Sequence, residues 1–269
     1  MSLSQKAVRN MSNICGNSGR HFAGFKDERL SREQTGGEFM LIGGIQKLSL
    51  LDYPEKMCCT IFTIGCDYRC PFCHNSSILA HGPENNLIPK EDVLKFLRTR
   101  KGLLDGVCIT GGEPLLQPGL EDFMREIKSL GFLVKLDTNG SYPERLKNIV
   151  NDGLVDYVAM DVKNSPAKYG KTVGIEPFDV MPIRESINFL LTDAVPYEFR
   201  TTVVKEFHTD KDLVELANWI QGTKHYYLQS FKDSGDVLKD GLHSYMEEEM
   251  QGFLEKIQPV IPSVELRGI

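Results

Sequence analysis

Three cysteines crowd into one short segment of the sequence. Cys66, Cys70 and Cys73 are separated by three residues and then by two, directly after an apolar run. Cubane iron-sulfur clusters normally take four cysteine ligands, so a loop that supplies three leaves one iron open. An open coordination position is typical of a catalytic metal site. The segment therefore predicts a catalytic cluster. A zinc site completed by His74 or a remote thiol is the alternative, although zinc motifs usually come as two separated pairs; ordinary core cysteines are a third interpretation.

Further candidate residues follow the next apolar runs. Thr110 to Pro114 reads Thr-Gly-Gly-Glu-Pro, in which Gly111 and Gly112 permit close backbone approach to a ligand and Glu113 offers an acceptor for an ammonium group. Taken alone, this segment is equally typical of a glycine turn before a helix. Residues 137–140 read Asp-Thr-Asn-Gly, a turn with the character of a helix cap.

One more polar segment ends the following apolar run. Asp161 and Lys163 lie two residues apart there, and by themselves they could form a surface ion pair. Arg200 is a charge within a strongly β-forming run, where a side chain can also simply point to solvent. The position of residues 137–140 and 161–163 at the ends of successive strands favours a common site for these two segments.

The elements that must position these residues alternate along the chain. We expect strands at 57–64, 106–110, 133–137, 155–161, 197–204 and 226–229, with helices between them, two of which open at Pro89 and Pro143. This alternation predicts a parallel sheet with right-handed crossovers. With about six units instead of the eight of a closed barrel, the fold class is α/β with a partial (β/α)6 barrel, which places ligand loops at the carboxyl ends of its strands. Cys58, Cys59 and Cys108 lie on these strands and are expected to be core residues without a ligand role.

Composition sets limits on the class of protein. The 269 residues are 41% hydrophobic and carry a net charge of −6, so a globular core is expected and no dominant basic surface for nucleic acid or an anionic membrane. No apolar stretch approaches the roughly 20 residues that span a bilayer, and the start lacks the apolar region of a secretory signal. Seven cysteines, three of them clustered, do not indicate a disulfide framework. We therefore expect a cytoplasmic protein without membrane contact.

The first 39 residues differ from the rest. They are rich in Ser, Asn, Gly, Gln and Arg and lack hydrophobic periodicity, so residues 1–39 are predicted to be a disordered or non-native extension and residues 40–269 the folded domain. Met40 could be the natural start. Because residues 1–26 contain basic residues and no acid, a transit peptide is the alternative.

The combination of these motifs resembles a known family. Cys-x-x-x-Cys-x-x-Cys with Phe72 before the last cysteine, followed by Gly-Gly-Glu, is similar to the signature of radical S-adenosylmethionine (SAM) enzymes. The resemblance implies a 4Fe-4S cluster on the three cysteines whose open iron binds SAM, with the residues 111–113 at its methionine amino group. The electron from the cluster then cleaves SAM to methionine and a 5'-deoxyadenosyl radical.

Later segments resemble one branch of that family, the activating enzymes for glycyl radical enzymes. The resemblance implies that Asp137, Thr138 and Asp161 contribute to a monovalent cation site and that Asp161 and Lys163 approach SAM. It also implies that Arg200 lies near the cofactor and an incoming peptide. Residues 229–232 lack the histidine that some activators carry there, which leaves the adenosine end of the pocket without an assigned residue.

The opening of the folded part narrows the resemblance. Residues 42–56 are similar to the start of one group of anaerobic ribonucleoside-triphosphate reductase activating proteins. This implies hydrogen removal from a glycine of a partner reductase, with flavodoxin or ferredoxin as the electron donor. Activation of another glycyl radical enzyme such as pyruvate formate-lyase, and a radical enzyme acting on a small molecule, as a deazaguanine synthase does, are the alternatives. A zinc-binding module without activity is the third.

Overall fold

A curved eight-stranded sheet forms the framework of the computed structural model, which describes residues 40–79, 87–233, 235 and 237–269. The strands follow the chain order and all neighbours are parallel except β1 and β2, which are antiparallel. They are β1 (Ile42–Ser49), β2 (Cys58–Thr63), β3 (Gly106–Gly111), β4 (Leu133–Thr138), β5 (Tyr157–Asp161), β6 (Tyr197–Val203), β7 (Tyr226–Ser230) and β8 (Val264–Arg267). The extension expected at 1–39 lies outside the described residues.

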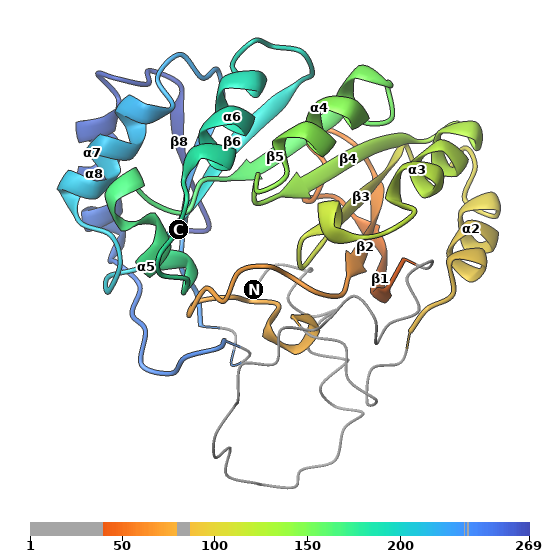
Figure 1. Cartoon of the computed structure of the whole chain (residues 1–269), viewed down its shortest axis with the longest axis horizontal. Helices are drawn as coiled ribbons and strands as arrows, with labels where there is room; N and C mark the ends of the chain where they lie inside the picture. Colours follow the sequence, from red (N-terminus) through yellow and green to blue (C-terminus); the bar gives the residue numbers. More distant parts are fainter. Residues whose placement is uncertain (1–39, 80–86, 234, 236) are drawn as a thin grey trace, which may run out of the picture.

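Helices cover the outer side of this sheet (Figure 1). Their apolar residues recur at helical spacing, as in α3, which buries Leu120, Phe123, Met124 and Ile127. None of the helices in the described part of the chain is both long and apolar enough to cross a membrane. The helices are α2 (Lys90–Arg98), α3 (Leu120–Ser129), α4 (Pro143–Asn151), α5 (Tyr169–Val173), α6 (Met181–Leu190), α7 (Asp210–Trp219) and α8 (Glu247–Ile257), with short 3-10 turns η1 (Ser76–Ile78), η2 (Pro114–Leu116) and η3 (Pro166–Lys168).

The strands present two different faces. On β4, Val134 and Leu136 belong to the apolar core beneath the helices, whereas Lys135 and Asp137 line cavities on the inner side of the sheet. This follows from the two-residue period of a strand, which points successive side chains to opposite faces. The apolar residues of the parallel strands therefore hold the helices, and the charged ones are collected inside.

A small apolar cluster closes the inner side at the amino ends of the central strands. Tyr53, Cys58 and Cys108 form it, with Leu133 and Tyr157 packed against them. Cys59 belongs to the main core instead. The expectation that the cysteines at 58, 59 and 108 are core residues is confirmed by their burial, since all three have 0% exposure.

The partial barrel is confirmed. All six predicted strands are present, and the sheet begins at β1 and ends at β8 without pairing between these two edges in the described residues. The two strands that the sequence pattern did not reveal are these edge strands. β1 contains Gly43 and Gly44, which weaken a strand pattern, and β8 has only four residues.

Candidate active site

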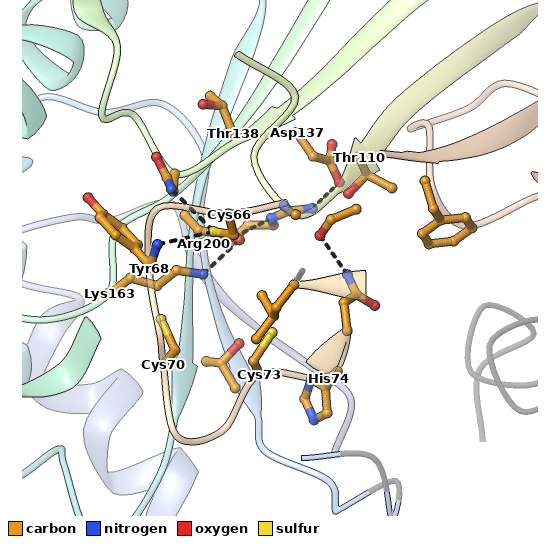
Figure 2. A pocket seen from close by; sticks show the side chains of 18 of the residues that line it. Cys66, Tyr68, Cys70, Cys73, His74, Thr110, Asp137, Thr138, Lys163 and Arg200 are labelled. Atoms are coloured by element: carbon orange, nitrogen blue, oxygen red, sulfur yellow. Dashed lines mark hydrogen bonds and ion pairs between the residues drawn. The ribbon is translucent and has the colours of Figure 1, made fainter. Parts of the chain in front are cut away.

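The three clustered cysteines lie on the loop that follows β2. Gly65 begins this loop with a φ of 96°, a conformation that favours glycine. Cys66, Cys70 and Cys73 then lie around one bend of the chain and line the same cavity (Figure 2). Burial raises the pKa of Cys66 and that of Cys70, the latter to about 12, so the protein alone favours thiols at these positions. Because metals bind the thiolate, loading the site must release protons.

Aromatic packing fixes the far part of the cysteine loop. Phe72 packs against Phe207, with ring centroids 5.6 Å apart. His74 stacks on Phe231 at 5.4 Å, and its Nε2 hydrogen-bonds the carbonyl oxygen of Lys232 at 2.8 Å. These contacts join the loop to the segments after β6 and after β7. A loop held in this way presents its sulfur atoms in a defined arrangement.

The glycines at the end of β3 allow the cysteine loop to pack closely. A Cβ atom at Gly112 would lie 1.9 Å from the carbonyl oxygen of Gly65, and one at Gly111 would lie 2.3 Å from the backbone nitrogen of Thr63. A side chain at Gly112 would therefore displace the start of the cysteine loop, and one at Gly111 would displace the end of β2. The Asn75 side chain also donates to the carbonyl oxygen of Gly111 at 2.8 Å. In this structure the close approach predicted from the glycine pair is made to the cysteine loop.

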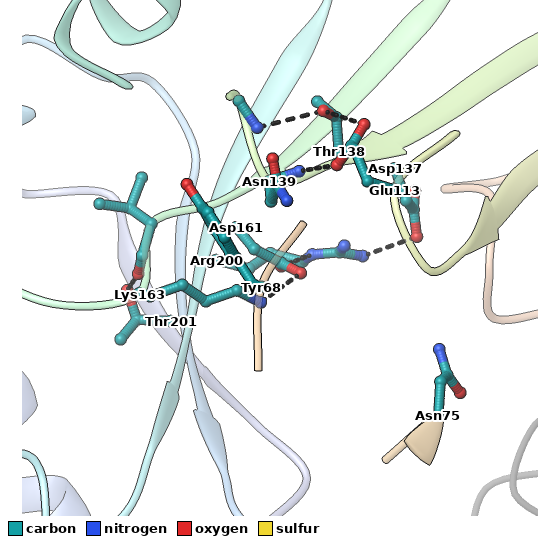
Figure 3. A network of polar contacts seen from close by, with 12 residues as sticks. Tyr68, Asn75, Glu113, Asp137, Thr138, Asn139, Asp161, Lys163, Arg200 and Thr201 are labelled. Carbon is teal, nitrogen blue, oxygen red and sulfur yellow. Dashed lines mark hydrogen bonds and ion pairs between the residues drawn. The ribbon is translucent and has the colours of Figure 1, made fainter. Parts of the chain in front are cut away.

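Glu113 has a fully buried carboxyl group. Its oxygens accept hydrogen bonds from the Thr138 hydroxyl at 2.8 Å, the Asn139 N–H at 2.7 Å and the Leu115 N–H at 2.9 Å. It therefore joins the end of β3 to the end of β4 and does not line the cavity of the cysteines (Figure 3). The contact with an ammonium group that we expected from the sequence stays a prediction.

The burial of Glu113 makes stability depend on pH. Burial raises the pKa of Glu113 to about 8, against the opposing effect of its hydrogen bonds. Between the ordinary carboxyl pKa of about 4.5 and pH 8, the unfolded chain is ionised here while the folded chain keeps the proton, so stability falls as pH rises. We expect this residue to contribute a slope of up to about 1.4 kcal/mol per pH unit. Urea unfolding of the cluster-free protein at pH 5, 6, 7 and 8 measures it.

Glu113→Gln is the matched variant for this measurement, because the amide cannot ionise. The free energy of unfolding of the variant should change less steeply with pH than that of the wild type. Only the difference between the two slopes is diagnostic, since the amide also loses an acceptor for the Asn139 N–H. Parallel curves would show that Glu113 is ionised in the folded protein throughout this range.

A network of ion pairs crosses β4, β5 and β6 on the inner side of the sheet. Arg200 donates to Asp161 through Nε at 2.9 Å and to Asp137 through Nη1 at 3.2 Å. Lys163 donates to the other oxygen of Asp161 at 3.0 Å, and Lys135 donates to the other oxygen of Asp137. Burial would raise the pKa of Asp161, but Arg200 and Lys163 outweigh it and lower that pKa to about 2. Burial would also raise the pKa of Asp137, but Arg200 and Lys135 lower it, so both carboxylates are ionised in the folded protein.

The network continues toward the edge of the sheet. Glu198 of β6 accepts two hydrogen bonds from the guanidinium group of Arg267 on β8, both at 2.9 Å. Arg200 lies 4.0 Å from Glu198 and so connects the two halves of the network. Residues from four strands are thus fixed relative to one another by charge-assisted hydrogen bonds.

One cavity of about 310 Å³ brings these parts together. It is lined by residues of the cysteine loop and by the carboxyl ends of β3, β4, β5 and β6, as parallel α/β folds arrange their ligand sites. Of the residues predicted from the sequence, it brings together the three cysteines, Gly111, Gly112, Asp137, Thr138, Asp161, Lys163 and Arg200. Glu113 is the one predicted residue that lies behind the cavity wall.

The sequence profile of the radical SAM superfamily matches residues 60–220, which include the cysteine loop and strands β3 to β6 of this cavity. The chain belongs to the radical SAM superfamily. It is therefore an oxidoreductase, and its family implies SAM and a 4Fe-4S cluster as cofactors.

Three relatives match different parts of this radical SAM chain. A protein of Methanocaldococcus jannaschii assigned as a glycyl-radical enzyme activating enzyme is 32% identical over 239 residues, which cover 85% of the chain and 96% of that protein. The pyruvate formate-lyase-activating enzyme of Clostridium pasteurianum is 34% identical, over 46% of the chain and 52% of that enzyme. The 7-carboxy-7-deazaguanine synthase of Koribacter versatilis is 32% identical, over 55% of the chain and 62% of that enzyme.

Solved structures share the fold of this radical SAM chain at low identity. Streptococcus suis SuiB, solved with bound S-adenosylmethionine, superposes with a TM-score of 0.58 at 15% identity. The match covers 76% of the chain and 48% of SuiB. This likeness supports the partial barrel and says nothing further about the reaction.

The donor set of the cysteine loop fits the cluster that the radical SAM family implies. Three thiols of Cys66, Cys70 and Cys73 line one cavity, and sulfur is the ligand that iron in such clusters takes. Within the described residues, no group of three His, Cys, Asp or Glu side chains is placed to hold a single metal ion. The thiol donors therefore suit the cluster that the family implies.

The monovalent cation that the resemblance implies does not fit this site. Its expected ligands already have partners, because each carboxylate oxygen of Asp137 and Asp161 accepts from a positively charged side chain. The Thr138 hydroxyl donates to Glu113 and accepts from the Gly140 N–H at 3.1 Å. We therefore derive no step through such an ion.

Several residues of the site were not predicted from the sequence. Asn139 donates to Asp67 at 2.8 Å and approaches the sulfur of Cys66 at 3.9 Å, so it supports the cysteine loop from β4. His208 is fully buried and its Nε2 hydrogen-bonds the carbonyl oxygen of Lys163 at 2.8 Å, which fixes the end of β5. For Asn139 the signal was its place within the Asp-Thr-Asn-Gly motif. The sequence around His208 contained no comparable signal.

Proposed function

We propose that this chain activates a glycyl radical enzyme, with anaerobic ribonucleoside-triphosphate reductase as its partner. In this proposal a 4Fe-4S cluster on the three cysteines supplies the electron that cleaves SAM. The 5'-deoxyadenosyl radical then takes a hydrogen atom from the α-carbon of one glycine of the partner, which gives 5'-deoxyadenosine and a glycyl radical. Flavodoxin or ferredoxin would reduce the cluster, and the reaction would take place in the cytoplasm in the absence of oxygen. The proposal includes no monovalent cation.

A second cavity carries the proposal. It has a volume of about 610 Å³ and is lined by the turn between β1 and β2 and by the ends of β7 and β8, the two edges at which the barrel is open. It shares Asp52, His74, Arg200, Thr202 and Gln229 with the cavity of the cysteines. The two cavities therefore adjoin, and in this proposal they form a path from the open side of the barrel to the cofactor site. An extended segment of another protein could reach the site by this path.

The rim of this path is apolar. Leu50 and Leu51 lie in the turn between β1 and β2, line the second cavity and are 60% and 65% exposed. Exposed leucines at the mouth of a site are typical of a surface that another protein covers. They support a protein substrate over a small molecule, which a closed pocket would surround more completely.

The residues of the chain have separate roles in this proposal. Lys163 presents an ammonium group to the cavity, where it can bind a carboxylate of SAM while Asp161 holds it in place at 3.0 Å. Arg200 lies on the wall between the two cavities and is fixed by both carboxylates, so it can position the cofactor and the incoming segment together. Cys66, Cys70 and Cys73 would hold the cluster.

Two other activities remain as alternatives. Pyruvate formate-lyase as the partner has the support of the relative from Clostridium pasteurianum, and a small-molecule reaction has that of the deazaguanine synthase. Each of these two matches covers about half of the chain, whereas the match to the Methanocaldococcus protein covers 85%. This difference in coverage favours activation of a glycyl radical enzyme.

Electron paramagnetic resonance tests the proposal directly. The protein is reconstituted with iron and sulfide without oxygen, reduced with dithionite, and incubated with SAM and an anaerobic ribonucleotide reductase. We expect a glycyl radical signal on the reductase and one 5'-deoxyadenosine for each radical formed. The same incubation with pyruvate formate-lyase separates the two partners. 5'-Deoxyadenosine without a radical on either protein would contradict the proposal and favour a small-molecule substrate.

The domain division is also a proposal, with residues 40–269 as the working domain. All eight strands and the core described above lie in this range. Deletion of residues 1–39 should therefore change the melting temperature by less than about 2 °C, the shift expected for a loss well below 1 kcal/mol. Cleavage of SAM should be unchanged within about twofold. Differential scanning calorimetry and chromatography of 5'-deoxyadenosine measure these quantities, and a large fall in either would show that the extension contributes to the domain.

A further inference from the structure

Lys135 is a buried lysine on the inner side of the sheet, with 1% exposure. On β4 it points to the same side as Asp137, and in the sheet it lies opposite Cys108 of β3 and Tyr157 of β5. Its Nζ donates to Oδ1 of Asp137 and lies 3.8 Å from the sulfur of Cys108. Removing an ammonium group from water costs several kcal/mol unless a partner compensates it. Asp137 is that partner.

All four carboxylate oxygens of Asp137 and Asp161 are paired with positively charged side chains. Lys135 and Arg200 each bond one oxygen of Asp137. Arg200 and Lys163 each bond one oxygen of Asp161. These are the groups to which the family resemblance assigned a monovalent cation. Here the positively charged partners are supplied by the chain itself.

The charge of this group also disfavours an added cation. Three positively charged side chains, Lys135, Lys163 and Arg200, face the two carboxylates, so the group already carries a charge of +1. An ion placed at bonding distance from the same oxygens would be repelled by all three. Without Lys135 the group would be neutral, and one oxygen of Asp137 would have lost its positively charged partner. A small cation could then bind there.

We propose that the ammonium group of Lys135 is a built-in cation, which fixes the Asp137 carboxylate beside the cofactor pocket and replaces a bound monovalent ion. Lys135 is thus a positioning residue, acting on the cofactor through Asp137 and Arg200. The inference concerns binding of SAM, so it holds for any protein that receives the radical.

Binding of SAM to the reconstituted, unreduced wild-type protein gives the first test. Calorimetric titrations are made in buffers whose salt is potassium, sodium or tetramethylammonium chloride, the last being too large to enter the site. We expect the dissociation constant for SAM to agree within about twofold among the three salts. Tighter binding by about tenfold or more in potassium or sodium would overturn the proposal, because the wild-type site would then take an ion despite Lys135.

The variant Lys135→Met gives the second test, since methionine keeps the length of the side chain and removes the charge. In tetramethylammonium we expect SAM to bind about 10- to 100-fold more weakly than to the wild type. Potassium, sodium or methylammonium should restore at least about tenfold of this loss. The melting temperature of the cluster-free variant should also rise with these ions by mass action, whereas that of the wild type should not.

Lys128→Met is the matched control, because Lys128 on α3 also pairs with an aspartate, Asp156, at 2.6 Å, but lies outside both cavities. The affinity of the Lys128→Met protein for SAM should equal that of the wild type in every salt. A loss of affinity in Lys135→Met that no small cation restores would overturn the proposal and leave Lys135 with a purely structural role. If Lys135→Met does not fold, the wild-type titrations decide the question alone.

Discussion

Replacing Cys66, Cys70 or Cys73 by alanine is expected to abolish cluster binding. Each thiolate would hold a different iron, so the loss of one thiolate leaves a cluster iron without its protein ligand. After anaerobic reconstitution, iron should fall from about four per chain to near zero, and 5'-deoxyadenosine should fall to the background level. Iron analysis, the visible absorption of the cluster and chromatography of the product measure these three effects.

Cys108→Ala is the matched control for the cysteine variants. Cys108 has 0% exposure and contacts Lys135 and Asp137, but it does not line the cavity of the cysteine loop. Its variant should bind the full amount of iron. Equal loss of iron in all four variants would contradict the ligand assignment. A wild-type protein that takes up zinc and no cluster would favour the closed zinc site instead.

Removal of the Arg200 guanidinium is expected to have the second-largest effect. Arg200 bonds both Asp137 and Asp161, and its side chain is 14% exposed. Truncating one partner of a buried ion pair typically costs about 3 to 5 kcal/mol, because the other charges stay buried with fewer partners. In Arg200→Met both aspartates would shift, and a misplacement of about 1 Å in a catalytic site can reduce the rate about 100-fold. Urea unfolding and the initial rate of 5'-deoxyadenosine formation measure the two losses.

Arg125→Met is the matched control, because it shows the effect of removing an arginine that pairs with two aspartates at the protein surface. Arg125 also pairs with two aspartates, Asp122 at 2.7 Å and Asp152 at 3.5 Å, but its side chain is 52% exposed. Exposed pairs contribute little because water already solvates both charges. Its variant should lie within about 0.5 kcal/mol of the wild type and cleave SAM at the wild-type rate. An Arg200→Met protein that behaves like Arg125→Met would show that the network does not position the cofactor.

The fold was predictable where the chain pattern is regular. The six inner strands are short apolar runs between amphipathic helices, and period and length distinguish these two patterns. The edge strands were missed for a physical reason. β1 carries two glycines and β8 only four residues, so neither has the continuous apolar run of a strand buried on both faces.

The sequence predicted which residues belong to the candidate site, but not which of them contact one another. The position of polar residues at the ends of parallel strands predicted that Asp137 and Asp161 lie at one edge of the sheet, whereas Arg200 was predicted there only from the family resemblance. The pairing of Lys135 with Asp137 was not predicted, although the two-residue period of a strand puts both on one face. It also did not reveal that Glu113 turns toward Thr138 and Asn139 instead of the cavity.

By itself, the sequence determined the chemistry that this chain can hold and the kind of scaffold that holds it. The spacing of the cysteines, the glycine pair and the alternation of strands and helices are local patterns. Local patterns can be recognised in the sequence without a structure. Only the tertiary structure decided which charges compensate one another. Lys135, Arg200 and Lys163 come from three successive segments of the sheet, and whether their partners are a bound ion, water or each other depends on distances of a few ångströms across strands. The distances between charges and their burial determine which charges pair. Neither the distances nor the burial can be derived from the order of the residues alone.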